Sequence, residues 1–162
     1  MDKNKFFNSP NITDLIKIIV NKVCSEEIFK TDEKIHLKKY ESSMKKINFI
    51  LVDGLGSKNI ENLDNILTQN QTDEIVSTFP SSTSVALGSV NFGSDPIENG
   101  LIGYYHFDKS ENRLINTLNW RGSENYLENK NFYSSQKTIW NTLNEKNIDS
   151  VSYTHLTLPT IN

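Results

Sequence analysis

A short apolar run that ends in an acid and two glycines constrains the fold of this 162-residue chain more than any other feature. The run is Ile47 to Asp53, INFILVD, and Gly54-Leu55-Gly56 follows it. Nearly continuous Ile and Val residues are typical of a strand buried on both faces, as in parallel sheets covered by helices. Catalytic groups in such sheets gather at the carboxyl ends of the strands. Asp53 stands at that end and is our first candidate functional residue.

The following segments predict a helix from about Ser57 to Leu67 and a second short strand from Glu74 to Phe79. This order forms a βαβ unit, whose crossover is almost always right-handed. A Ser/Thr-rich turn at 80–84 leads into small and apolar residues at 85–92, which suit a tightly packed helix ended by Gly93 in the left-handed conformation. We therefore expect an α/β fold with a mostly parallel central sheet flanked by helices.

Helices and surface strands are expected around this unit. Residues 10–24 have apolar side chains at helical spacing, with Asn11 or Thr13 available as the N-cap. Residues 105–120 predict surface strands and loops, and a last helix is expected from about 135 to 146.

The composition indicates an ordered globular protein, with 36% hydrophobic and 23% charged residues. A net charge of −3 gives no electrostatic reason to expect nucleic acid. Six lysines between Lys30 and Lys46 are expected on a solvated connector. The single cysteine, Cys24, is expected to pack, and it excludes an internal disulfide or a cysteine-built metal cluster. No run approaches the ~20 apolar residues of a membrane span, so we expect a cytoplasmic protein without nucleic-acid or membrane partners, and we leave its oligomeric state open.

The chain changes character at Ser150. Residues 151–160, VSYTHLTLPT, lack the Lys, Asp, Glu and Asn that are common upstream, and they resemble a translated adapter from sequencing-library construction. We therefore treat 1–150 as the N-terminal portion of a single larger domain and 151–162 as a non-native tail. The gene is expected to continue beyond residue 150, and His155 is set aside as a metal ligand.

Asp53 and the Ser/Thr turn can act together if both follow neighbouring parallel strands, because they then face one crevice and can share a metal ion. A hydroxyl needs a base or a cation to become a good nucleophile, and the N–H groups of a helix N-terminus hold phosphate. This arrangement predicts phosphoryl transfer. The residues alone equally allow a simple Asp53-Gly54 turn and an N-cap cluster at Ser81 to Ser84.

Four motifs, taken in order, resemble the opening of the type I phosphodiesterase/nucleotide pyrophosphatase family, a branch of the alkaline phosphatase superfamily. They are FILVDGLG at 49–56, STFPSSTSVA at 77–86, GSDPIENGLIGY at 93–104 and NTLNW at 116–120. The resemblance, which covers about residues 10–120, implies an alkaline-phosphatase-like α/β fold, two divalent metal ions, usually zinc, and a Thr or Ser nucleophile that is transiently phosphorylated. It also implies that Asp53 ligates a metal ion.

The resemblance selects Thr83 as the nucleophile, in contact with the metal. Family nucleophiles lie ten residues before a glycine that closes the helix, and seven more lead to a second glycine; Thr83, Gly93 and Gly100 have this spacing. Ser82 and Thr78 are the neighbouring candidates. Thr78 matches the local Thr-Phe-Pro string of nucleotide pyrophosphatases and remains the second choice.

Two residues depart from the family pattern. Asn99 replaces the usual His of a His-Gly pair, which affects local packing more than chemistry, and Tyr104 replaces a substrate-binding Asn of nucleotide pyrophosphatases. Nearby, His106 and Asp108 are expected on a surface strand, and Asp95 is expected to form a turn before Pro96.

The function expected from the resemblance is metal-dependent hydrolysis of small phosphodiesters or phosphomonoesters through a phosphorylated Thr. The remaining Asp and His ligands come from the later half of family members, so this truncated chain is expected to be inactive. Hydrolysis of sulfate esters or phosphonates is an alternative, as is a non-catalytic binding protein with the same fold.

Overall fold

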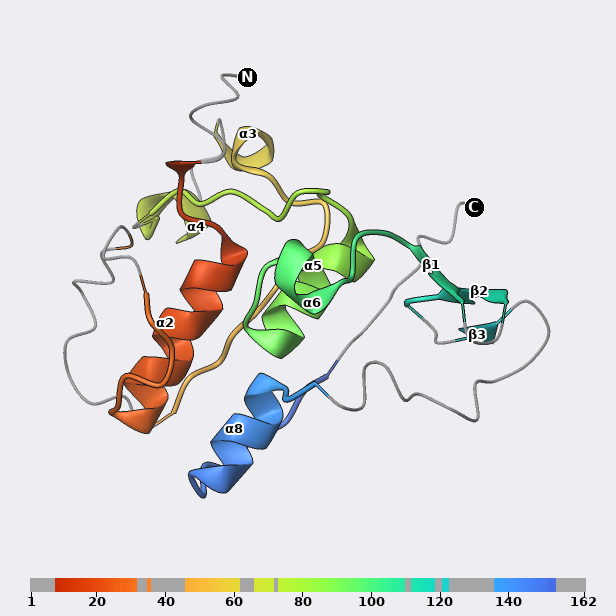
Figure 1. The fold of residues 1–162 in the computed structure, drawn as a ribbon. Coiled ribbons are helices and arrows are strands. Elements are labelled where there is room, and N and C mark those ends of the chain that lie inside the picture. The colour runs from red at the N-terminus through yellow and green to blue at the C-terminus, as the bar shows by residue number, and fades with distance from the viewer. Residues whose placement is uncertain are drawn as a thin grey trace.

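The computed structural model describes residues 8–31, 35, 46–61, 66–71, 73–109, 112–118, 121–122 and 136–153. The helices are α2 (Ile12–Cys24), α3 (Ser57–Ile60), α4 (Ile66–Gln69), α5 (Thr83–Phe92), α6 (Pro96–Asn99) and α8 (Ile139–Glu145). The strands are β1 (Tyr105–Asp108), β2 (Arg113–Asn116) and β3 (Arg121–Gly122). Three helices, α2, α5 and α8, lie together, and the small sheet lies on the far side of α5 from α2 (Figure 1).

The core is the contact between these three helices. Its buried side chains are Ile12, Ile16 and Val20 from α2, Val90 from α5, and Ile139 and Leu143 from α8. The three α2 residues recur every fourth position, so they form one apolar stripe along the helix. The core thus joins the beginning, middle and end of the described chain.

The predicted first helix is confirmed, with Asn11 as its N-cap. The Asn11 side-chain oxygen accepts from the N–H groups of Thr13 (2.7 Å) and Asp14 (3.1 Å), and the Asp14 carboxylate accepts from the Asn11 N–H (2.9 Å). This reciprocal arrangement satisfies N–H groups that have no partner inside the helix.

Helix α5 is also confirmed, although it begins two residues before the predicted start. Gly93 ends it in the left-handed conformation (φ 60°), as the sequence predicted. Gly88 allows Leu101 to approach the middle of this helix, because a Cβ atom at Gly88 would lie 2.4 Å from Leu101 Cδ1.

The prediction of a strand buried on both faces at Ile47 to Asp53 is wrong. The segment is extended but pairs with no strand in the described part of the chain. Phe49 packs against the helical core, whereas Ile50 is 80% exposed and Val52 is 54% exposed. Phe49 therefore contacts the helices, and the side chains of Ile50 and Val52 have no layer over them among the described residues.

The predicted second strand is reduced to one residue pair. Val76 forms an isolated parallel bridge with Asn11, through bonds from Ile12 N–H to Val76 O (3.1 Å) and from Val76 N–H to Pro10 O (2.9 Å). The helix expected between the strands is two short pieces, α3 and α4, with 62–65 outside the described residues.

The strands that do pair form an antiparallel sheet in the order β1-β2-β3, in line with the surface strands expected at 105–120. A mostly parallel central sheet is not seen in the described residues. Parallel pairing depends on distant segments meeting, which a local apolar pattern does not determine.

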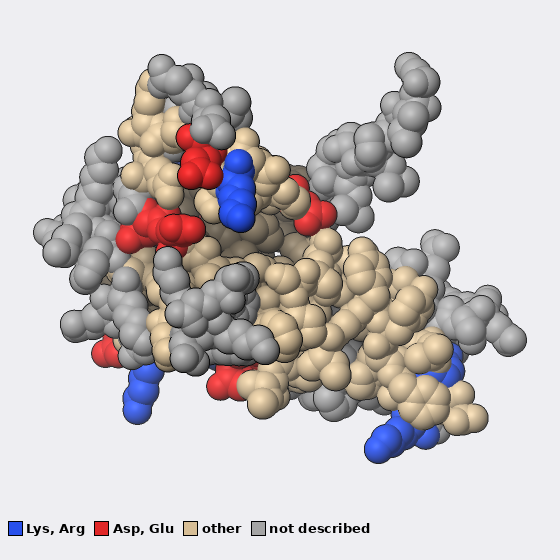
Figure 2. Space-filling model, turned by 90° about the horizontal axis from the view of Figure 1, so that it is seen from above, with Lys and Arg blue, Asp and Glu red and all other residues tan. Residues whose placement is uncertain are grey.

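The surface carries both signs of charge. Asp and Glu side chains gather around a hollow on the face seen in Figure 2, with Lys or Arg side chains beside them and toward the edges. None of the described helices has the length and apolar character needed to cross a bilayer. Of the tail set aside above, Val151, Ser152 and Tyr153 are described and exposed, and His155 lies outside the described residues.

Replacing Gly88 by Ala should destabilise the protein by about 1 kcal/mol, because overpacking costs about 1–3 kcal/mol and the gain in helix propensity offsets about 1 kcal/mol of it. Leu101 is 3% exposed and cannot swing into solvent. The measurement is the urea midpoint of unfolding. In a Leu101→Ala background the same substitution should become stabilising; stabilisation by Gly88→Ala alone would contradict the close contact.

Candidate functional site

Asp53 lies in the turn that follows the extended segment. Gly54, the next residue, has a φ of 69°, a conformation that glycine adopts without strain. The Asp53 side chain is exposed, so its carboxylate is accessible to a ligand.

Thr83 is the first residue of α5, directly after the N-cap Ser82. Its hydroxyl Oγ1 donates toward the Asp53 carboxylate and lies 3.4 Å from both Oδ1 and Oδ2. The two residues that the sequence singled out therefore meet, with Thr83 at a helix N-terminus as expected. They meet without the pair of buried parallel strands from which we predicted the contact.

The N-terminus of α5 presents backbone donors at the same place. The Ser82 side chain does not cap the helix, and among the described residues no acceptor is seen for the N–H groups of Thr83, Ser84 and Val85. The Oγ atoms of Ser82 and Ser84 are buried without a hydrogen-bond partner in this part of the structure. Free N–H groups and the helix dipole together favour an anion at this end of the helix.

Thr78, the second candidate nucleophile, lies in a different environment. It is 2% exposed, and its hydroxyl donates to the Pro80 carbonyl at 2.9 Å. A buried hydroxyl that already bonds to the backbone is typical of a structural role. The geometry therefore favours Thr83 over Thr78 as the candidate nucleophile.

The structure also places the other residues that the sequence analysis named. Asp95 is the N-cap of α6, which refines its prediction as a turn former. Asn99 is 1% exposed within a hydrogen-bond network, and Tyr104 is 42% exposed. His106 and Asp108 lie on β1, as expected of a surface strand. The sequence did not predict the burial of Asn99, because its partners are set by how α6 folds back on α5.

The pair formed by Asp53 and Thr83 fits part of a metal site. Zinc–oxygen bonds of about 2.0–2.2 Å in a tetrahedron place neighbouring ligands about 3.3–3.6 Å apart, and the observed separation is 3.4 Å. However, no group of three or more His, Cys, Asp or Glu side chains that could hold a metal ion lies among the described residues. Thr83 Oγ1 and one Asp53 carboxylate oxygen therefore fit two ligand positions of one metal ion, and further ligands would be needed to complete its coordination.

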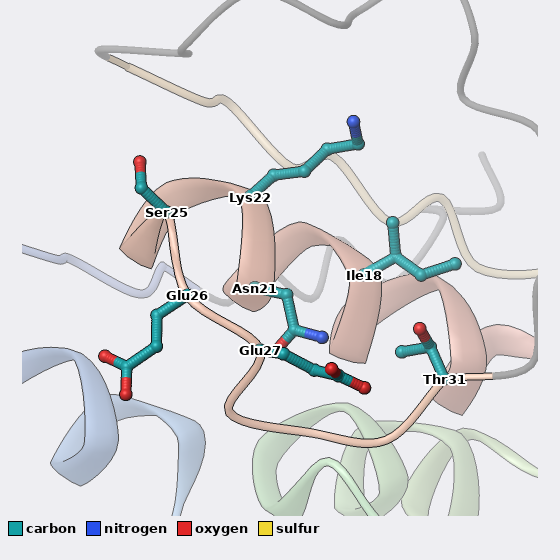
Figure 3. A pocket seen from close by; sticks show the side chains of 7 residues that line it. All are labelled: Ile18, Asn21, Lys22, Ser25, Glu26, Glu27 and Thr31. Carbon is teal, nitrogen blue, oxygen red and sulfur yellow. The ribbon is translucent and has the colours of Figure 1, made fainter.

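A separate hollow of about 300 Å³ lies at the C-terminal end of α2. Figure 3 shows the side chains that line it, of which Asn21 and Glu26 form hydrogen bonds within the protein. Asn21 accepts from the N–H groups of Ile28 and Phe29 (both 2.9 Å) and donates to the Phe29 carbonyl (2.7 Å). Glu26 accepts a hydrogen bond from Lys146, which raises the pKa of Lys146. These bonds give Asn21 and Glu26 structural roles at the end of α2.

Cys24, at the end of the same helix, packs against the core as predicted. Burial raises the pKa of its thiol, partly opposed by the nearby Lys146 ammonium. The thiolate is the reactive form of cysteine, so a raised pKa makes Cys24 a poor nucleophile.

Replacing each threonine by the isosteric valine should separate their roles. Thr78→Val should destabilise the chain by about 1 kcal/mol, because it removes the hydrogen bond from the buried Thr78 hydroxyl to the Pro80 carbonyl. Thr83→Val should cost about 0.5 kcal/mol or less, as substitutions of accessible residues usually do. Urea unfolding measures both. Equal costs would contradict the assignment of Thr78 as the structural threonine.

Comparisons with known proteins agree with the motifs. No curated protein and no solved structure matches the chain. The family model described as type I phosphodiesterase / nucleotide pyrophosphatase matches residues 49–161, a range that includes Asp53 and Thr83. The match also runs through 151–161, so the interpretation of these residues as a non-native tail stays a prediction. Because the match covers more than half of the sequence, the chain belongs to the type I phosphodiesterase/nucleotide pyrophosphatase family.

Proposed function

We propose that this chain carries the nucleophile half of a metal-dependent phosphoester hydrolase, with Thr83 as the nucleophile. The observation that carries the proposal is the contact of Thr83 Oγ1 with both carboxylate oxygens of Asp53 at 3.4 Å, at the N-terminus of a ten-residue helix. Membership of the family supports the class of reaction.

The residues around Thr83 suit an anionic substrate. The N–H groups at the start of α5 point along the helix axis toward the position that a phosphoryl oxygen would take, and the helix dipole favours negative charge there. Asp53 accepts the Thr83 hydroxyl hydrogen bond and so orients the oxygen that attacks.

In the proposed reaction, Thr83 Oγ1 forms a bond to phosphorus while the bond from phosphorus to the leaving ester oxygen breaks. The hydroxyl proton of Thr83 passes to solvent, and one proton from solvent goes to the leaving alkoxide, which departs as an alcohol. Water then attacks phosphorus as the bond from phosphorus to Thr83 Oγ1 breaks; one water proton restores the Thr83 hydroxyl, and the remaining hydroxyl leaves on the released phosphate. The sum is ester plus water giving alcohol plus phosphate product, in two steps that are each easier than one.

A divalent cation, zinc in our proposal, would make the bound hydroxyl more acidic and neutralise charge on the phosphoryl group. Asp53 and Thr83 supply two oxygen ligands, whereas a zinc ion takes about four. We infer that polypeptide outside the described residues supplies the rest. The exposed face of Ile50 and Val52, next to Asp53 in sequence, is where we expect that polypeptide to pack.

In the intact enzyme, meaning this chain together with the polypeptide that supplies the remaining ligands, Thr83→Ala should abolish turnover of an aryl phosphodiester. The loss should appear in kcat, because the bond-forming oxygen is removed. Thr78→Ala is the matched control and should lower kcat much less, apart from its effect on stability. Loss of turnover from Thr78→Ala alone would reverse the assignment.

The 162-residue chain by itself should not hydrolyse an aryl phosphodiester above the rate of buffer with the same zinc concentration, because two ligands do not hold a catalytic metal ion. The measurement is release of the aryl alcohol with and without added Zn²⁺. Zinc-dependent turnover that Thr83→Ala removes would show that no further ligands are needed.

A further inference from the structure

We propose that Asn99 is a positioning residue, which holds α5 at the rotation that brings Thr83 against Asp53. The inference rests on the proposed function for its catalytic meaning, and on the hydrogen bonds of Asn99 for its geometry.

Asn99 forms hydrogen bonds to α5, to its own loop and to a residue near α8. Its amide Nδ2 donates to Ser94 O (2.9 Å) and lies 3.4 Å from Ser89 Oγ on α5, and its Oδ1 accepts from the Leu101 N–H (2.8 Å). Its backbone carbonyl accepts from Gln136 Nε2 at 3.2 Å, near the start of α8. The Asn99 side chain is buried, at 1% exposure, and both its amide nitrogen and its amide oxygen have hydrogen-bond partners.

These bonds fix what the apolar core leaves free. Contact between apolar groups is not directional, and α5 offers the three-helix core only Val90. The other buried residues of α5 include Gly88, which receives Leu101, and Ser89, which receives Asn99. A satisfied buried polar network specifies one arrangement among several that pack equally well.

The rotation of α5 matters because Thr83 is its first residue. A helix with its side chains has a radius of about 5–6 Å, so a rotation of about 20° moves a side-chain tip by about 2 Å. A shift of that size would break the 3.4 Å contact between Thr83 and Asp53. Asn99 therefore acts on the candidate nucleophile from the opposite end of the same helix.

The test measures the contact directly in the 162-residue chain, labelled with ¹³C at threonine methyl groups. The readout is the change in the Thr83 methyl resonance caused by Asp53→Asn, compared between backgrounds. We expect this change to fall about twofold or more in an Asn99→Ala background, as coupled sites do when their link is cut.

Asn21→Ala is the matched control, because the Asn21 amide also holds a loop through three hydrogen bonds but at the far end of α2. The response of Thr83 should persist there. An unchanged response in the Asn99→Ala background, with helix content retained by circular dichroism, would overturn the proposal.

A second variant covers loss of the fold in Asn99→Ala. Ser89→Ala removes only the partner on α5, so a reduced Thr83 response in that background supports the proposal and an unchanged response overturns it. The resonance does not depend on turnover. If Thr83→Ala left the intact enzyme active, the proposed function would fail while the positioning of Thr83 by Asn99 would still be decided by this measurement.

Discussion

The packing of α5 between α2 and α8 is the constraint on which the rest of the structure depends. Val90 meets apolar side chains of both neighbouring helices, and Trp140 Nε1 donates to Asn91 Oδ1 at 2.8 Å across the α5–α8 contact. Because α5 begins with Thr83 and ends near α6, this packing supports a helix that carries the candidate nucleophile at one end and meets the Asn99 network at the other. The three-helix core is thus the support of the site as well as the source of stability.

The extended segment before Asp53 shows that an apolar run can predict an extended conformation correctly and its burial wrongly. Phe49 finds the helical core, but Ile50 and Val52 face outward, and no strand pairs with their backbone in the described part of the chain. Burying such side chains contributes about 1.5–3 kcal/mol each, so a layer over this face would add appreciably to stability. The same exposed segment ends at Asp53, so a layer over it would also lie beside the Asp53–Thr83 contact.

The sequence predicted features that depend on neighbouring residues better than features that depend on residues far apart in the chain. Asn11 and Gly93 act on backbone groups within a few residues, so the sequence alone predicted the end of α5 at Gly93 and limited the N-cap of α2 to Asn11 or Thr13. Strand pairing depends on segments far apart in the chain, and the parallel sheet expected from the sequence is not seen among the described residues. The contact of Asp53 with Thr83, thirty residues apart, was predicted from two neighbouring strands that are not seen among the described residues, and the family spacing only selected Thr83 among the hydroxyl residues. Asn99 was recognised as a departure, but its bonds to Ser89 and Leu101 depend on tertiary structure.

The electrostatics of the Asp53–Thr83 pair explain why the proposed chemistry calls for a cation. A carboxylate at the N-terminus of α5 is stabilised by the helix dipole, yet it competes with a phosphoryl group for the same positive end. Two anions within a few ångströms repel each other unless a cation lies between them. The proposed phosphoester chemistry therefore calls for a cation between the Asp53 carboxylate and the phosphoryl group, held in part by the oxygens that meet in the Asp53–Thr83 contact.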